Sequence, residues 1–143
     1  MFVYLDASFL VALLLKSHAK HQLAYEALKD LSKKAAKIFL STLTIDECWY
    51  ILYSSQDNAN IPFSEFSSSF SQTIEHFLNT NNVIFPDKCN GESLLRAALK
   101  SSVKFNLRPR DAFHYAYASD INASFYTLDS DFEFTDLDVQ LLF

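Results

Sequence analysis

Short apolar runs alternate with longer amphipathic stretches along this chain. Runs rich in β-branched and aromatic side chains, such as residues 2–5, predict strands. Stretches whose apolar residues recur every three or four positions predict helices, because that spacing keeps them on one helix face. The predicted strands cover residues 2–5, 38–40, 83–85, 124–128 and, as a short last strand, 139–142. The predicted helices cover residues 7–16, 23–31, 62–78 and about 92–105, and two more begin near Thr44 and at Pro109.

The order of these elements predicts the fold class. Helices alternate with the predicted strands, and this alternation is typical of an α/β fold whose parallel sheet is covered on both faces. The chain has no internal repeat, no linker and no low-complexity tract beyond a mild serine-rich patch at residues 67–69. We therefore expect a single domain over residues 1–143, which is a common length for one domain.

Composition and cysteine usage agree with an ordinary globular protein. Half of the 143 residues are apolar, which is enough to bury a core without disulfides or structural metals. Cys48 lies in an apolar stretch and Cys89 in a polar, turn-like segment. Neither has the spacing of a zinc site, and such an unpatterned pair favours a reduced intracellular protein over a disulfide.

The apolar N-terminal segment, residues 1–15, raises the question of a signal peptide or a membrane span. The segment contains Asp6 and no basic run precedes it. Its apolar stretches are also shorter than the roughly 20 residues that a spanning helix needs. We therefore expect a soluble, cytoplasmic protein that does not associate with a membrane.

Acidic residues follow the predicted elements at positions that one edge of a parallel sheet would share. Asp6 closes the first predicted strand, and Asp129 closes the strand at 124–128. Ligands of open parallel sheets bind outside the carboxyl ends of the strands. The helix near Thr44 would bring Glu47 to this edge, and the helix from Pro109 would add Asp111 if it runs parallel to it.

Crowded carboxylates predict a metal cofactor at that edge. Like charges raise one another's pKa values, and a cluster of acids generally holds a hard divalent cation. Oxygen ligands select Mg²⁺ or Mn²⁺ over zinc, and they need no histidine beside them.

The formal net charge of −5 argues against a basic surface that binds nucleic acid through many phosphate contacts. This objection weakens if the four acids bind cations, because the remaining surface is then nearly neutral.

Four short motifs carry these acids in a characteristic order. They are Leu5-Asp6-Ala7-Ser8, Ser41-Thr42-Leu43-Thr44-Ile45-Asp46-Glu47, Arg108-Pro109-Arg110-Asp111-Ala112-Phe113-His114-Tyr115-Ala116 and Thr127-Leu128-Asp129-Ser130-Asp131-Phe132. Their order and spacing resemble a PIN domain, in particular the VapC-type toxins of bacterial and archaeal toxin–antitoxin pairs. The likeness spans almost the whole chain, and the ordered set is more specific than any one motif.

This resemblance implies a three-layer α/β/α sandwich with a mostly parallel central sheet. It implies a Mg²⁺- or Mn²⁺-dependent endoribonuclease that hydrolyses RNA phosphodiester bonds, forms a homodimer and is inhibited by a small antitoxin protein. By position, Asp6, Glu47, Asp111 and Asp129 match the acidic quartet of the family. Ser8 matches the hydroxyl or amide residue that often supports the first acid.

Two positions qualify this match. The family commonly has an acid two residues beyond the fourth one, so Asp131 is a further candidate metal ligand that could exchange roles with Asp129. Ala7 and Ser8 stand where many members have Thr-Asn. This departure concerns only the support of Asp6 and leaves the quartet unchanged.

Each acid also has an ordinary structural explanation. Asp6 could simply cap the helix that follows it, and Glu47 has the capping-box spacing from Thr44. Asp111 would be favourable at a helix N-terminus through the helix dipole alone. Neighbouring Asp46 points about 100° away from Glu47 around the helix and is expected to be solvated.

The residues around the quartet have open roles. Arg108 and Arg110 are candidates for contact with RNA phosphates, with plain surface ion pairs as the alternative. His114 could face the site or the core, and we favour a structural or substrate-edge role because oxygen-ligated metals do not require it. Trp49 and the aromatic face of helix 62–78 are interpreted as core and dimer surface, with base stacking as the alternative.

Two other functions compete with a nuclease. A receiver-like phosphoacceptor domain also uses strand-end acids and Mg²⁺. It needs a phosphoacceptor Asp after one central strand and a Lys after another, and strands 38–40 and 83–85 are not followed by that pair. A non-catalytic PIN-like module that binds RNA or protein would keep the fold but lose acids, whereas the quartet is intact here.

Overall fold

The computed structural model describes residues 1–55, 59–86 and 91–142. Its centre is a five-stranded sheet of order β3-β2-β1-β4-β5 in which every strand pairing is parallel. The strands are β1 (Phe2–Leu5), β2 (Lys37–Phe39), β3 (Val83–Ile84), β4 (Ser124–Thr127) and β5 (Val139–Leu141). The helices are α1 (Ala7–Leu14), α2 (His21–Lys33), α3 (Thr42–Tyr53), α4 (Phe63–Thr80), α5 (Gly91–Phe105), α6 (Pro109–Asp120) and the short 3₁₀ turn η2 (Ser130–Phe132).

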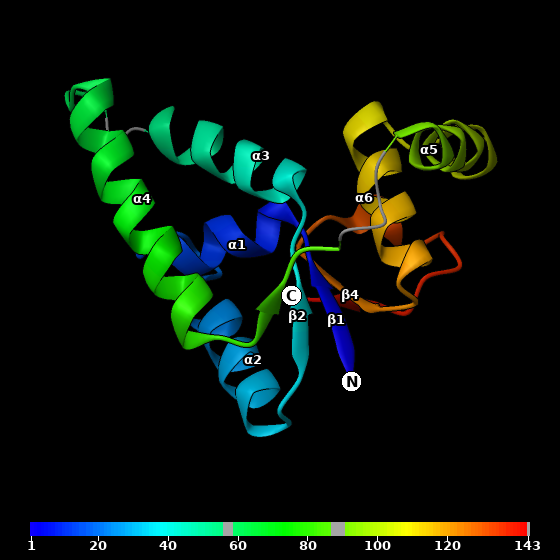
Figure 1. Cartoon of the computed structure of the whole chain (residues 1–143), viewed down its shortest axis with the longest axis horizontal. Coiled ribbons are helices and arrows are strands. Elements are labelled where there is room, and N and C mark those ends of the chain that lie inside the picture. The colour runs from blue at the N-terminus through cyan, green and yellow to red at the C-terminus, as the bar shows by residue number, and fades with distance from the viewer. Residues whose placement is uncertain (56–58, 87–90, 143) are drawn as a thin grey trace.

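Helices cover both faces of this sheet, which confirms the predicted α/β/α sandwich. Figure 1 shows α1 to α4 on one side of the strands and α5 and α6 on the other. The alternation of side chains along β1 explains the two layers, because successive residues of a strand point to opposite faces. Val3 and Leu5 belong to the core under α1 to α4, whereas Tyr4 packs with Phe125 and Ala118 on the α6 side.

The strand order places a reversal between β1 and β4. From β1 the chain proceeds outward to β2 and β3, and it then returns to add β4 and β5 on the other side of β1. Ligands of such sheets bind at the carboxyl ends of the strands beside the reversal. Asp6 lies directly after β1 and Asp129 lies two residues after β4, so both acids reach this position.

All the predicted strands and helices are confirmed, and only their ends differ. The helix predicted over 7–16 ends at Leu14, and the helix predicted near Thr44 begins at Thr42. Ser41 explains the earlier start, because its hydroxyl accepts a hydrogen bond of 3.1 Å from the Thr44 amide and caps the helix. Cys89 and residues 56–58 of the predicted turn lie outside the described residues.

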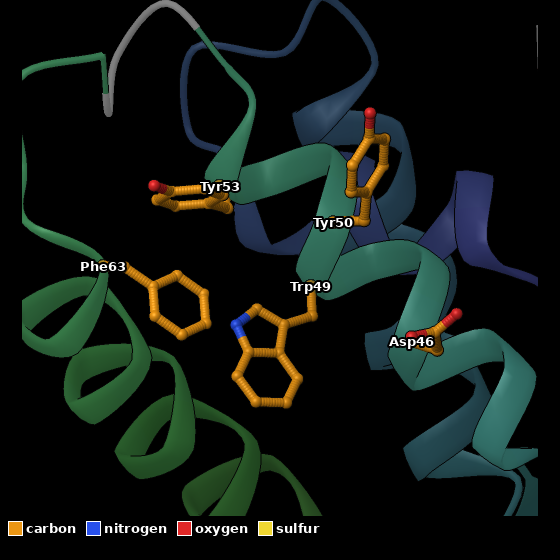
Figure 2. A pocket seen from close by; sticks show the side chains of 5 residues that line it. All are labelled: Asp46, Trp49, Tyr50, Tyr53 and Phe63. Atoms are coloured by element: carbon orange, nitrogen blue, oxygen red, sulfur yellow. The ribbon is translucent and has the colours of Figure 1, made fainter.

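The aromatic face of α4 forms part of the core, as predicted. The buried side chains of this face are Phe66, Phe70, Ile74 and Phe77. Among the described residues, no helix is both long and apolar enough to cross a membrane. The rings nearest the start of α4 reach the surface. Figure 2 shows Trp49 and Tyr53 of α3 beside Phe63 of α4, around a pocket of about 230 Å³.

Candidate functional site

Three aspartates meet at the carboxyl end of β4. Oxygen atoms of Asp111, Asp129 and Asp131 lie within 4.8 Å of one another. Asp111 comes from the first turn of α6, which begins at Pro109, and the other two come from the turn after β4. The Asp129 carboxylate accepts a 2.9 Å hydrogen bond from the Asp131 amide, which holds that turn in place. This part of the predicted convergence is present in the structure.

Crowding has a clear electrostatic consequence for Asp111. Its pKa is raised from 3.8 to about 6, first because the carboxyl is removed from water and then because Asp129 lies close. His114 lowers the pKa, while Asp131 and Glu47 raise it further. No described residue forms an ion pair with any of the three aspartates. A divalent cation would relieve this repulsion.

Glu47 contributes a fourth carboxylate to the same cleft. The cleft has a volume of about 420 Å³, and it is lined by Glu47, the three aspartates and residues 108–110. Glu47 Oε2 lies 2.7 Å from His114 Nε2, and its Oε1 lies 3.4 Å from Arg110 Nε. The capping-box explanation for this residue is wrong, because Ser41 caps α3 and places Glu47 in the second turn of the helix. Asp46 is exposed, as predicted.

Asp6 lies beneath this group rather than among the three clustered acids. It is 4% exposed and caps α1, because its Oδ1 accepts a 2.9 Å hydrogen bond from the Phe9 amide. Ser8 Oγ donates to Oδ1 at 2.8 Å, and Thr127 Oγ1 donates to Oδ2 at 2.5 Å. Burial raises the pKa of Asp6, and His114 and these hydrogen bonds oppose the rise.

Two hydroxyls connect Asp6 to the aspartate cluster. Thr127 Oγ1 accepts a 2.9 Å hydrogen bond from the Asp129 amide, and Ser8 Oγ accepts one of the same length from the Leu128 amide. The backbone after β4 is therefore held by side chains that also hold Asp6. Ser8 does not line the cleft, and its hydroxyl is engaged by these partners.

The arginines predicted to contact substrate lie at the rim. Arg108 and Arg110 are exposed and line the cleft. Arg110 forms an ion pair with Glu47, as the alternative to phosphate contact predicts for this residue. Arg108 forms no ion pair with a described residue.

The sequence patterns predict no role for two residues of this region. One is Thr127, although a hydroxyl two residues before a strand-end acid is a usable signal. The other is Tyr4, which the pattern predicts only as a strand residue. Its hydroxyl lies 2.8 Å from His114 Nδ1, so His114 is buried under the cleft and forms hydrogen bonds on both ring nitrogens.

The donor set fits a hard divalent cation. All four side chains around the cleft floor offer carboxylate oxygens, which is the chemistry of Mg²⁺ and Mn²⁺ sites. His114 is not required as a ligand, since its ring nitrogens are occupied by Tyr4 and Glu47. Asp111, Asp129, Asp131 and Glu47 are therefore the residues that could hold the metal.

The chain resembles known proteins in sequence and in fold. The PIN domain family model matches residues 3–137. No curated protein matches the sequence. Among solved structures, VapBC2 from Rickettsia felis, bound to a DNA fragment from its promoter, has a TM-score of 0.71 at 15% identity and covers 100% of both chains. FitAcB from Neisseria gonorrhoeae has a TM-score of 0.68 at 15% identity, with 96% of this chain and 95% of that chain covered.

A third structure is described as a sarcin–ricin loop cleaving toxin, VapC20 from Mycobacterium tuberculosis. Its TM-score is 0.66 at 18% identity, with 96% of this chain and 98% of that chain covered. At such identities the similarity concerns the fold. It supports the α/β fold with a parallel central sheet.

Proposed function

Since this chain belongs to the PIN domain family, whose model matches residues 3–137, we propose that it is a metal-dependent endoribonuclease. The proposed reaction is hydrolysis of RNA phosphodiester bonds. The observation that carries the proposal is the convergence of three aspartates within 4.8 Å, from two separate segments, with Glu47 in the same cleft.

The proposed metal ligands are Asp111, Asp129 and Asp131, with Glu47 in the same cleft. Asp6 belongs to the same site but lies buried beneath these ligands. It accepts a hydrogen bond from Thr127 Oγ1, which in turn accepts one from the Asp129 amide and so holds the end of β4. A bound Mg²⁺ or Mn²⁺ would supply Lewis-acid stabilisation of phosphate charge and favour deprotonation of the attacking water. The carboxylates of the chain hold and orient these groups.

The cleft rim offers contacts for the substrate. Arg108 and Arg110 are exposed beside Asp111, and guanidinium groups suit the planar geometry of phosphate oxygens. These two side chains are the proposed RNA-binding residues. Few phosphate contacts are required, because a metal held by the acids would itself attract the phosphate that reacts, despite the net charge of −5.

We further propose that the protein is the toxin of a toxin–antitoxin pair and acts in the cytoplasm. The VapBC2 and FitAcB structures support this proposal through their fold, and VapC20 supports RNA as the substrate class. A homodimer and a small antitoxin partner belong to the same proposal.

Cleavage of total RNA by the purified protein tests the enzymatic part. We expect cleavage with Mn²⁺ or Mg²⁺, loss of cleavage with EDTA and recovery when the cation is restored. The Asp111→Asn variant should cleave on the order of 100-fold more slowly or worse, whereas the matched carboxyl-to-amide change Glu75→Gln, at an exposed position of α4, should cleave normally. Cleavage that resists EDTA, or wild-type activity in Asp111→Asn, would contradict the proposal. Binding of RNA without cleavage would indicate a non-catalytic module instead.

Growth of cells that express the chain tests the toxin part. Expression of the wild type without a partner should slow growth, and Asp111→Asn at the same protein level should not. Harmless expression of an RNA-cleaving wild type would contradict the toxin assignment while leaving the nuclease assignment in place.

A further inference from the structure

A chain of hydrogen-bonding side chains runs under the cleft and ends on Glu47. The Tyr4 hydroxyl lies 2.7 Å from Ser41 Oγ and 2.8 Å from His114 Nδ1. His114 Nε2 lies 2.7 Å from Glu47 Oε2. Tyr4, Ser41, His114 and Glu47 are each at most 8% exposed. The polar atoms of Tyr4 and His114 are therefore shielded from water, and they need hydrogen-bond partners within the protein.

The available protons are compatible with one direction along this chain. Thr44 lies 3.2 Å from the Tyr4 hydroxyl, but its own hydroxyl donates to the Leu5 carbonyl oxygen. Ser41 Oγ accepts from the Thr44 amide and lies 2.7 Å from the Tyr4 hydroxyl and 3.1 Å from Thr44 Oγ1. If Ser41 donates to Tyr4 at the shorter of these distances, the single proton of Tyr4 is directed to His114 Nδ1.

A tyrosine donor fixes the tautomer of a neutral histidine. If Tyr4 donates to Nδ1, that nitrogen is unprotonated and the ring proton sits on Nε2. Nε2 faces Glu47, so the ring donates to a carboxylate, which can only accept when it is ionised. With this direction, Tyr4, His114 and Glu47 all have a suitable partner.

Packing alone does not account for the hydroxyl of Tyr4. Its ring stacks on Phe125 at 5.5 Å and on Tyr117 at 6.2 Å, and a phenylalanine would make the same stacks. A buried hydroxyl is tolerated only when it is hydrogen-bonded. Its contacts, however, all lead toward α3 and the ring of His114.

We infer that Tyr4 and His114 are positioning residues for Glu47. Tyr4 selects the tautomer that donates from Nε2, and the resulting bond holds the Glu47 carboxylate in the cleft. Without it, Glu47 would keep only its 3.4 Å ion pair with Arg110 on the exposed rim, among the side-chain contacts of the described residues. Partners of this kind behind a ligating side chain commonly change metal affinity by about 10- to 100-fold when they are removed. The inference rests on the proposed metal site.

The tautomer can be measured in the metal-free protein, without any activity. Long-range ¹H–¹⁵N correlation spectra should show His114 protonated on Nε2 and bare on Nδ1. Protonation of Nδ1, alone or together with Nε2, would overturn the inference. In Tyr4→Phe the Nδ1 resonance should shift away from its hydrogen-bonded position, and an unchanged resonance would likewise overturn it.

Mn²⁺ affinity, followed by electron paramagnetic resonance of the free ion, tests the consequence. Tyr4→Phe should bind Mn²⁺ about 10-fold more weakly. Ser101→Ala, which removes another buried hydroxyl that contacts α6 at the Ala112 carbonyl, should bind as the wild type does. Equal affinity in Tyr4→Phe and the wild type would overturn the inference.

Two replacements of His114 distinguish a hydrogen-bond donor to Glu47 from a side chain that only fills the space. Glutamine places its amide nitrogen where Nε2 lies, whereas asparagine reaches only to the place of Nδ1. His114→Gln should keep Mn²⁺ affinity within about 3-fold, and His114→Asn should lose about 10-fold or more. Equal affinities for the two variants would overturn the inference. A wild type that binds Mn²⁺ but cleaves no RNA would contradict the proposed nuclease and leave the positioning role standing.

Discussion

Helix α3 separates two regions with opposite energetics. On one side, Glu47 joins the three aspartates of the cleft, where like charges lie within 4.8 Å and raise the pKa of Asp111 to about 6. On the other side, Trp49 and Tyr53 form the aromatic pocket with α4 (Figure 2). Like-charge repulsion in the cleft opposes folding, whereas ring burial on the aromatic side contributes stability. One helix thus carries part of the proposed metal site and part of the aromatic packing through neighbouring residues.

The aromatic region is built from stacked rings. Trp49 stacks on Phe70 at 5.4 Å and on Phe63 at 6.2 Å, and Phe66 and Phe70 lie 6.1 Å apart. Each ring removes apolar area from water and gains a favourable ring contact. This region lies on the side of α3 away from α6 (Figure 1), so changes in it should leave the cleft intact.

The largest effect on stability is expected from Phe70→Ala. The side chain is 7% exposed, so the substitution leaves a cavity and should lower the free energy of unfolding by about 3–5 kcal/mol. Urea unfolding followed by circular dichroism measures this loss. Under conditions where it remains folded, the variant should bind Mn²⁺ with wild-type affinity, and a large loss of affinity would show that the two regions are coupled. Phe63→Ala, at a ring that is 54% exposed, is the matched control and should cost far less.

Filling the cleft should produce the next largest effect, with the opposite sign. At a free Mn²⁺ concentration about 100 times its Kd, binding to the folded state alone raises the free energy of unfolding by about 2.7 kcal/mol. Urea unfolding with Mn²⁺ and then with EDTA measures the difference. Phe63→Ala should keep this gain, whereas Asp111→Asn should lose most of it. An equal gain in Asp111→Asn would place the bound ion elsewhere.

The same contrast explains how much could be predicted from the sequence. The elements and the sheet edge were predictable because apolar periodicity and strand-end acids are local features, and Asp111, Asp129 and Glu47 converge as expected. Asp131 joins them because the turn after β4 is tight, with Asp129 accepting from its amide.

Other parts of the site depend on contacts between segments far apart in the chain. Asp6 was predicted to lie with the other acids, but Thr127, which follows it by 121 positions, covers its carboxylate. The bond between Tyr4 and His114 spans 110 positions and exists only because α6 lies across the face of the sheet that Tyr4 occupies. No local pattern specifies that placement.

The smallest effect expected is the pH dependence of stability that Asp111 causes. Its pKa is raised in the folded protein from 3.8 to about 6, so the folded state binds a proton more tightly than the unfolded state does. The stability of the metal-free protein should therefore decrease as the pH rises through this window, and the full penalty applies above it. Because the carboxyl is partly in contact with solvent, we expect a loss of about 1–2 kcal/mol in the free energy of unfolding rather than the full value of the shift.

The variant Asp111→Asn cannot ionise at this position. Between about pH 4 and pH 7 in EDTA, the wild type should therefore lose about 1–2 kcal/mol of unfolding free energy relative to this variant. Asp46→Asn, an exposed change on the aromatic side of α3, should show no such drift. Parallel pH profiles for the wild type and Asp111→Asn would mean that the crowded acids cost the folded protein nothing, and the energetic contrast between the two sides of α3 would then be wrong.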